Sequence, residues 1–136
     1  YKKLNRKLVG YNRSIFWVEV KMRLPWLIIE VNLDPTRGSE TGKIRPCIIV
    51  TNNTYNERVP IIQVVPITAW SEKKAKIRSN VEIEPSEANR LTKKSLADCL
   101  QTRPIDYFSR LVDIRGEVEP EVLLKIDRAL RIVFAL

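Results

Sequence analysis

Short apolar runs alternate with polar, turn-rich segments along most of the chain from position 26 onward. The runs are rich in β-branched residues and are bounded by proline, glycine, asparagine or charged residues, a pattern typical of short strands. We therefore predict strands in six segments, which are 26–33 (WLIIEVNL), 47–50 (CIIV), 60–68 (PIIQVVPIT), 79–84 (SNVEIE), 95–102 (SLADCLQT) and 110–118 (RLVDIRGEV). Between them we expect a polar loop at 34–43, a basic loop at 69–78, a short helix at 85–91 and a turn around 104–109.

The last segment, 119–136, has a different period. Its apolar residues recur every three or four positions, as on one face of a helix. Pro120 suits the first helical position, and the flanking Glu119 and Glu121 suit the positive end of the helix dipole. The segment predicts an amphipathic helix, whose apolar residues are Val122, Leu123, Ile126, Ala129, Leu130, Val133 and Phe134.

Several short strands followed by a helix indicate a mainly β protein with helices (α+β), in which a curled sheet of small-barrel kind is capped by helices. The 136 residues suit one domain, which we place at 26–136. Residues 1–25 mix basic and aromatic residues and are interpreted as an N-terminal appendage. That segment can be a tail, an extra strand, or translated sequence upstream of a start at Met22, the single methionine.

The formal net charge of +8 is unevenly distributed. Residues 1–27 carry seven Lys or Arg and one acid, whereas 28–136 carry 17 basic and 15 acidic residues. The charge of the body therefore gives no general argument for nucleic-acid binding. No apolar run reaches the length of a membrane span, so we expect a cytoplasmic protein without membrane contact.

The chain contains no histidine. This excludes Ser/His/Asp and Cys/His triads, two-histidine ribonuclease chemistry and the common zinc sites. Cys47 and Cys99 lie in apolar segments without metal-ligand spacing, so we expect them to be small buried hydrophobes. Any catalysis must then depend on arginine, carboxylates, hydroxyls or backbone groups, and we expect neither metal nor cofactor.

The segment 33–50, LDPTRGSETGKIRPCIIV, places Arg45 before Pro46 at the start of a strand, directly after a polar loop. One interpretation is a polar hairpin with Arg45 as a solvated flanking residue. The other is an anion site built by the loop.

Together with VVPIT, LQTRPID and the C-terminal IDRALRIVFAL, this segment resembles the MazF/PemK toxins of bacterial toxin–antitoxin pairs, from about residue 28 to the C-terminus. The spacing D-P-x-x-G-x-E-x-x-K-x-R-P is its most specific motif. The resemblance implies an SH3-like barrel, a homodimer, and metal-independent cleavage of single-stranded RNA at short sequences. It also implies an antitoxin whose acidic, extended tail occupies the RNA groove.

The resemblance implies roles for five residues. Arg45 and Thr68 match the catalytic pair at the scissile phosphate, Glu40 matches a loop acid that some members need, and Gln101 and Arg103 match an element that holds RNA and antitoxin. The chemistry requires no imidazole, since the 2′-hydroxyl attacks the adjacent phosphorus and leaves a 2′,3′-cyclic phosphate and a 5′-hydroxyl. A guanidinium at Arg45 suits the charge of that transition state.

Three further residues are candidates for holding RNA. Arg37 and Lys43 lie in the loop, and Trp70 precedes a basic run and can stack a base. Trp70 and its lysines can equally form a solvated loop. Glu40 is our first candidate for the general base, with pairing to Lys43 or Arg45 as the alternative.

The start of the first strand departs from the family pattern, because Trp26 and Leu27 stand where Gly-Asp is usual. This leaves a second hypothesis, a catalytically inactive SH3-like binding module or a toxin directed at gyrase. Gyrase-directed relatives have a C-terminal tail with tryptophan, whereas this chain ends in VFAL.

Overall fold

The computed structural model describes residues 27–51 and 59–136, so the predicted appendage 1–25 and Trp26 lie outside the described residues. The described chain forms a sheet of seven strands in the order β4-β5-β3-β2-β1-β7, with β6 paired to β3. All neighbouring strands are antiparallel. The strands are β1 (Leu27–Asn32), β2 (Ile44–Ile49), β3 (Ile61–Ala69), β4 (Asn80–Ile83), β5 (Ser95–Asp98), β6 (Arg103–Asp106) and β7 (Leu111–Glu117).

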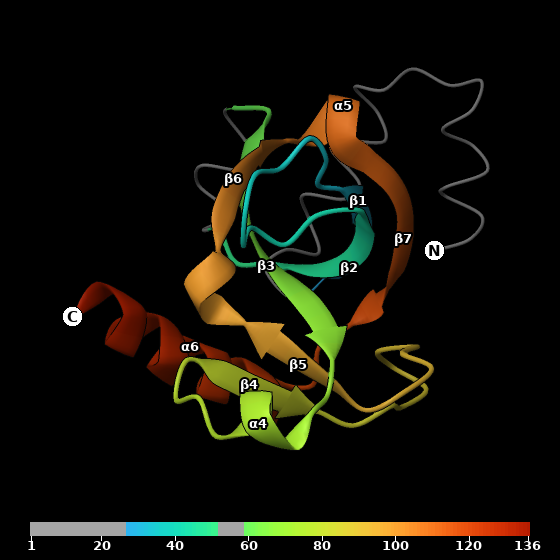
Figure 1. Cartoon of the computed structure of the whole chain (residues 1–136). Helices are drawn as coiled ribbons and strands as arrows, with labels where there is room; N and C mark the ends of the chain where they lie inside the picture. The colour runs from blue at the N-terminus through green and yellow to red at the C-terminus, as the bar shows by residue number, and fades with distance from the viewer. Residues whose placement is uncertain (1–26, 52–58) are drawn as a thin grey trace.

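The sheet curls strongly without closing into a barrel (Figure 1). Its outer strands β6 and β7 are joined by the short helix α5 (Tyr107–Arg110), and within the described residues no ladder pairs them. The 3₁₀ helix η1 (Cys99–Gln101) joins β5 to β6, and helix α6 (Pro120–Phe134) packs beside β4. The predicted class, a mainly β fold with helices and a C-terminal amphipathic helix, is confirmed.

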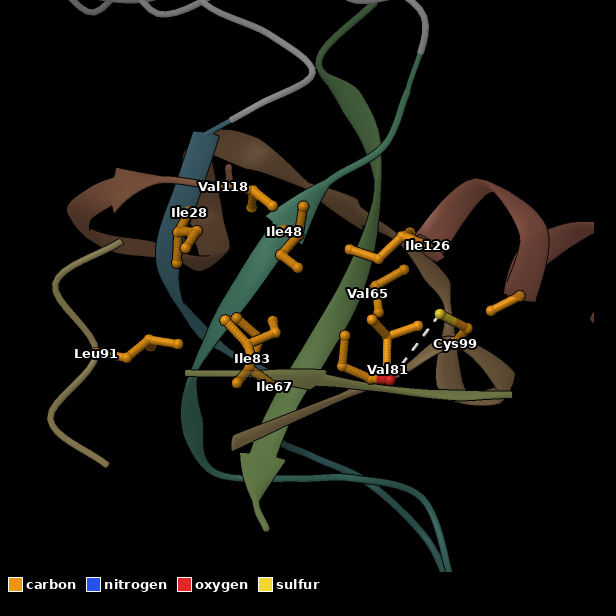
Figure 2. Close-up of a cluster of buried hydrophobic side chains, with 12 residues drawn as sticks. Ile28, Ile48, Val65, Ile67, Val81, Ile83, Leu91, Cys99, Val118 and Ile126 are labelled. Carbon is orange, nitrogen blue, oxygen red and sulfur yellow. Dashed lines mark hydrogen bonds between the residues drawn. The ribbon is translucent and has the colours of Figure 1, made fainter. Parts of the chain in front are cut away.

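Two hydrophobic clusters lie on opposite faces of the curled sheet. Along β1, Ile29 and Val31 belong to the first cluster, whereas Ile28 belongs to the second. In Figure 2 the second cluster gathers side chains from several strands around Ile48 and Val65, with Ile126 of α6 alongside. Residues 27–29 of β1 and 47–49 of β2 are buried on both faces, so these parts of the two strands are continuous apolar runs rather than alternating ones.

Both cysteines are buried and free, as expected for small core residues. Cys47 belongs to the first cluster and Cys99 to the second. Burial raises the pKa of each thiol from its ordinary value of 9.0 to about 12. Neither sulfur is therefore a thiolate near neutral pH, and neither is a candidate nucleophile.

The short helix predicted at 85–91 is wrong, because these residues form a turn around Asn89. The buried Asn89 Oδ1 accepts hydrogen bonds from the backbone N–H groups of Ser86 (2.9 Å) and Leu91 (3.0 Å), and its Nδ2 donates to Glu84 O (2.8 Å). Arg90 then takes a left-handed φ of 55°. These side-chain bonds and the left-handed Arg90 close the segment as a turn, in which Arg90 N donates a single helix-like bond to Ser86 O (3.0 Å).

The expected loop at 69–78 instead contains a single helical turn, α4 (Glu72–Ala75), with Ser71 Oγ accepting from Lys74 N (3.2 Å). The expected turn at 104–109 is β6 followed by α5, where Asp106 Oδ2 accepts from Ser109 N (2.9 Å). Both corrections concern four-residue helices defined by a capping side chain rather than by apolar periodicity.

Candidate active site

The site lies where β2 and β3 separate. In an antiparallel ladder, every second pair of opposed residues exchanges backbone hydrogen bonds. Val50 N donates to the opposed Gln63 O (3.0 Å), so Ile48 and Val65 form the next hydrogen-bonded pair, and Pro46 and Ile67 would form the one after it. Pro46 has no N–H to donate, and the recorded ladder ends at Cys47 and Pro66. Beyond this point no described strand pairs with this edge of β3, whose other edge pairs with β5, so an opening lies between the ends of β2 and β3.

Arg45 and Thr68 both line the space at this opening. Side chains alternate along each strand, so Arg45 lies on the same face as Cys47, and Thr68 lies on the same face as Pro66, the ladder partner of Cys47. Both side chains are half-buried. Arg45 Nε donates to Gly42 O (2.8 Å), which orients the guanidinium, and no side chain or carbonyl of the described residues accepts a hydrogen bond from its two terminal nitrogens.

The loop 33–43, which we call the active-site loop, is closed at its base by Leu33 N donating to Lys43 O (2.9 Å). Lys43 has a left-handed φ of 66° at this closure. Two arginines hold the start of the loop through backbone carbonyls. Arg103 Nη1 donates to Leu33 O (3.1 Å), and Arg110 Nη1 donates to the carbonyls of Asn32 (3.0 Å) and Asp34 (2.8 Å).

Gln101 holds the other side of the active-site loop. Its Oε1 accepts from Thr41 N (3.3 Å), and its Nε2 donates to Ser39 O (3.2 Å). These two bonds flank Glu40, whose carboxylate accepts from the backbone N–H of Arg37 (2.5 Å). Within the described residues no ion pair joins Glu40 to Lys43 or Arg45, the alternative that the sequence left open.

A cavity of about 690 Å³ opens between the active-site loop, the end of β3 and η1. It brings together five of the eight predicted site residues, namely Arg45, Thr68, Glu40, Lys43 and Gln101. Lys74, Asp34 and Asp98 also line it, so its charged side chains balance in sign. Across 27–51 and 59–136, no group of three or more histidine, cysteine or acidic residues has an arrangement that could hold a metal ion.

The other three predicted residues do not line this cavity. Arg37 is an exposed loop residue, and the guanidinium of Arg103 is engaged with the loop backbone. Trp70 Nε1 donates to Glu82 Oε1 (2.7 Å), and Lys94 Nζ lies 4.5 Å from the centre of its ring. The predicted roles of these residues in RNA binding stay predictions.

Sequence reasoning missed the supporting residue Arg110 and the lining residue Asp98. Lys74 lies in the basic run that the sequence marked as a candidate for meeting phosphates, and the structure places it on the cavity. No local sequence pattern identified Arg110, because its hydrogen bonds to the loop join residues that are 76 and 78 positions apart in the sequence.

The model of the PemK-like, MazF-like toxins of type II toxin–antitoxin systems matches residues 25–134. The chain belongs to this family. The chain is 35% identical over 105 residues to Endoribonuclease EndoA of Bacillus subtilis (strain 168), a match that covers 77% of this chain and 88% of that protein.

Solved structures show the same fold at lower identity. MazF from Deinococcus radiodurans superposes with a TM-score of 0.68 at 21% identity, over 82% of this chain and 94% of that one. A mycobacterial endoribonuclease in complex with its cognate antitoxin gives a TM-score of 0.63 at 21% identity, over 83% and 95%. No helix among the described residues is long and apolar enough to cross a membrane.

We predict that replacing Gln101 with alanine loosens the active-site loop. The substitution removes two hydrogen bonds to the loop backbone, each worth about 0.5 to 1.5 kcal/mol. Hydrogen exchange of a peptide covering 38–44 should accelerate by roughly threefold to tenfold per bond lost. The control is Gln63→Ala, which removes a bond to Thr102 and leaves the loop untouched. Equal exchange in the Gln101 variant and the parent protein would show that Gln101 does not hold the loop.

Proposed function

We propose that this endoribonuclease toxin cuts single-stranded RNA at specific short sequences, without a metal, through attack of the 2′-hydroxyl on the adjacent phosphorus. The observation that carries the proposal is the convergence of Arg45 and Thr68 on one cavity from opposing strands. A guanidinium and a hydroxyl on one face are the donors that a phosphate in transfer requires.

In the proposed reaction the 2′-oxygen forms a bond to phosphorus as the bond to the 5′-oxygen breaks. The products are a 2′,3′-cyclic phosphate and a 5′-hydroxyl, so no water is consumed in this step. The terminal nitrogens of Arg45 stabilise the charge that builds on the non-bridging oxygens, while Thr68 Oγ1 donates to one of them. The proton that the 5′-oxygen gains balances the one that the 2′-hydroxyl loses.

Glu40 is the proposed acceptor of the 2′-hydroxyl proton. It lines the same cavity as Arg45 and Thr68, and the bonds of Gln101 on either side fix its backbone. The absence of histidine from the whole chain supports a carboxylate in this role. The proposed route needs no metal, because the guanidinium of Arg45 supplies the positive charge that the transferring phosphate requires.

We propose that the partners follow the family. The mycobacterial neighbour is an endoribonuclease in complex with its cognate antitoxin. For this chain we propose an antitoxin with an acidic tail that occupies the RNA groove, and action in the cytoplasm. The exposed apolar side chains of Leu124, Ile132 and Phe134 on α6 support a homodimer. Residues 26–136 are proposed to carry the activity, with 1–25 as an appendage.

The first test is incubation of the full chain with a long single-stranded RNA in EDTA, with mapping of the cut ends. We expect cleavage that leaves 5′-hydroxyl ends. Arg45→Lys and Thr68→Val should each lower kcat by about a hundredfold to a thousandfold, because each removes a donor to the transition state. Arg131→Lys is the matched control, since Arg131 is exposed and forms a local (i,i+4) ion pair with Asp127 on α6.

Three results would contradict this proposal. RNA binding without cleavage would favour the inactive binding module. Cleavage that needs a divalent ion would exclude the metal-independent route. Full activity of the Arg45 and Thr68 variants would place the chemistry elsewhere.

Glu40→Gln separates a base from a loop contact. The amide keeps an oxygen that can accept from Arg37 N, but it cannot take a proton. We expect kcat to fall by about a hundredfold to ten-thousandfold, while loop exchange at 38–44 stays unchanged. Glu40→Asp should retain more activity than Glu40→Gln. Unchanged kcat in Glu40→Gln would limit this side chain to its contact with Arg37.

A further inference from the structure

A second, smaller cavity of about 200 Å³ adjoins the first. The two cavities share Arg45, Thr68 and Ala69 as lining residues, so the proposed catalytic pair separates them. The remaining walls come from β2, from β3, from the segment 91–95 that leads into β5, and from β7. They are Ile44, Pro46, Ile67, Leu91, Thr92, Lys93, Ser95 and Arg115.

The charges of the two cavities differ. Asp34, Glu40 and Asp98 line the first cavity, whereas no acidic residue of the described chain lines the second. The basic residues of the second cavity are Arg45, Lys93 and Arg115. An anion therefore meets a more favourable field in the smaller cavity.

The wall formed by β7 is fixed before any ligand binds. The guanidinium of Arg115 donates through Nε to Arg90 O (2.9 Å) and pairs through Nη1 with Glu30. A Cβ on the neighbouring Gly116 would lie 2.4 Å from Ala88 O, so only glycine lets this turn lie directly against β7. The carboxylate of Glu30 partly offsets the charge of Arg115, which leaves Lys93 as the more available cation.

Lys93 is exposed at the rim, and within the described residues no ion pair is recorded for its ammonium group. Its carbonyl accepts from Ser95 Oγ (2.8 Å), which anchors its backbone to the start of β5. The other walls mix polar side chains, such as Thr92 and Ser95, with apolar ones, including Ile44, which is 55% exposed beside Arg45. A cation at the rim and a wall of mixed polarity suit a nucleotide, with its phosphate on the cation and its base against the apolar side chains.

We infer that the second cavity holds the RNA nucleotide next to the scissile phosphate, and that Lys93 binds the phosphate of that nucleotide. The inference rests on the proposed function, because it takes Arg45 and Thr68 to hold the scissile phosphate. A polynucleotide carries one phosphate per nucleotide, so a strand held at these two residues places its next phosphate close by. The smaller cavity is contiguous with them and has the positive lining.

The test compares Lys93→Gln with Lys94→Gln in the full chain. Lys94 carries the same charge, but it lies over the Trp70 ring, pairs with Glu82 and Glu84, and does not line the cavity. The probe is a random pool of single-stranded 2′-O-methyl oligonucleotides, in which the attacking hydroxyl is blocked. We expect the slope of log K against log salt to become shallower by about 0.7 in Lys93→Gln, as for one lost phosphate contact. The slope should stay at the parent value in Lys94→Gln.

Equal slopes for the parent protein and Lys93→Gln would overturn the inference, as would equal losses in both variants. A third result would also overturn the inference. If Lys93→Gln weakened binding of a polyglutamate peptide and left the salt slope for the oligonucleotides unchanged, the cavity would be a site for an acidic peptide. If the parent protein cleaves RNA and the salt slope of Lys93→Gln equals that of the parent, this subsite is rejected and the proposed function stands. A changed slope without any cleavage would reject the proposed function and keep Lys93 as a phosphate contact.

Discussion

The register between β2 and β3 is the constraint on which the rest of the site depends. Side chains alternate strictly along a strand, so a slip of one residue would turn Thr68 or Arg45 away from the other. The buried runs on either side fix this register, because Ile48 and Val65 must face one cluster while Ile49 and Val64 face the other. The hydrophobic core thereby sets the relative position of two polar residues that it does not contain.

Pro46 ends the β2–β3 ladder next to the two cavities. A residue with an N–H at this position could extend the ladder and close the space between β2 and β3. Proline ends the ladder there, β3 continues into its pairing with β5, and both cavities open beside Arg45 and Thr68. The Arg-Pro pair thus combines a guanidinium with the residue that makes room for its ligand.

The active-site loop depends on contacts that are distant in sequence. Arg103 and Arg110 hold its start, and Gln101 holds its far side. Two residues that resemblance assigned to RNA and antitoxin, Gln101 and Arg103, therefore also shape the loop that carries Glu40. A loss of activity on mutating either one would combine binding and loop effects, and the exchange experiment separates them.

The sequence predicted the parts of the fold that depend on local pattern. Long apolar runs defined β1 and β3, and periodicity defined α6. It did not predict α4, α5 or the turn at Asn89. Each is a single turn that depends on one capping or bridging side chain, so it is too short to show a periodic pattern of apolar residues. Family resemblance located Arg45 and Thr68. The second cavity could not be predicted from the sequence, because its walls are distant in the chain. It forms only when β1 pairs with both β2 and β7 and brings Arg115 near Arg45.

A double-mutant cycle on RNA cleavage tests the central claim most directly. The rate constants of the parent protein, Arg45→Lys, Thr68→Val and the double variant are compared under single-turnover conditions. If both side chains act on one phosphorus, the double variant should lose much less than the product of the two single losses, because residues that work as a unit are strongly non-additive. Losses that multiply would mean that the two residues act independently, which contradicts the account.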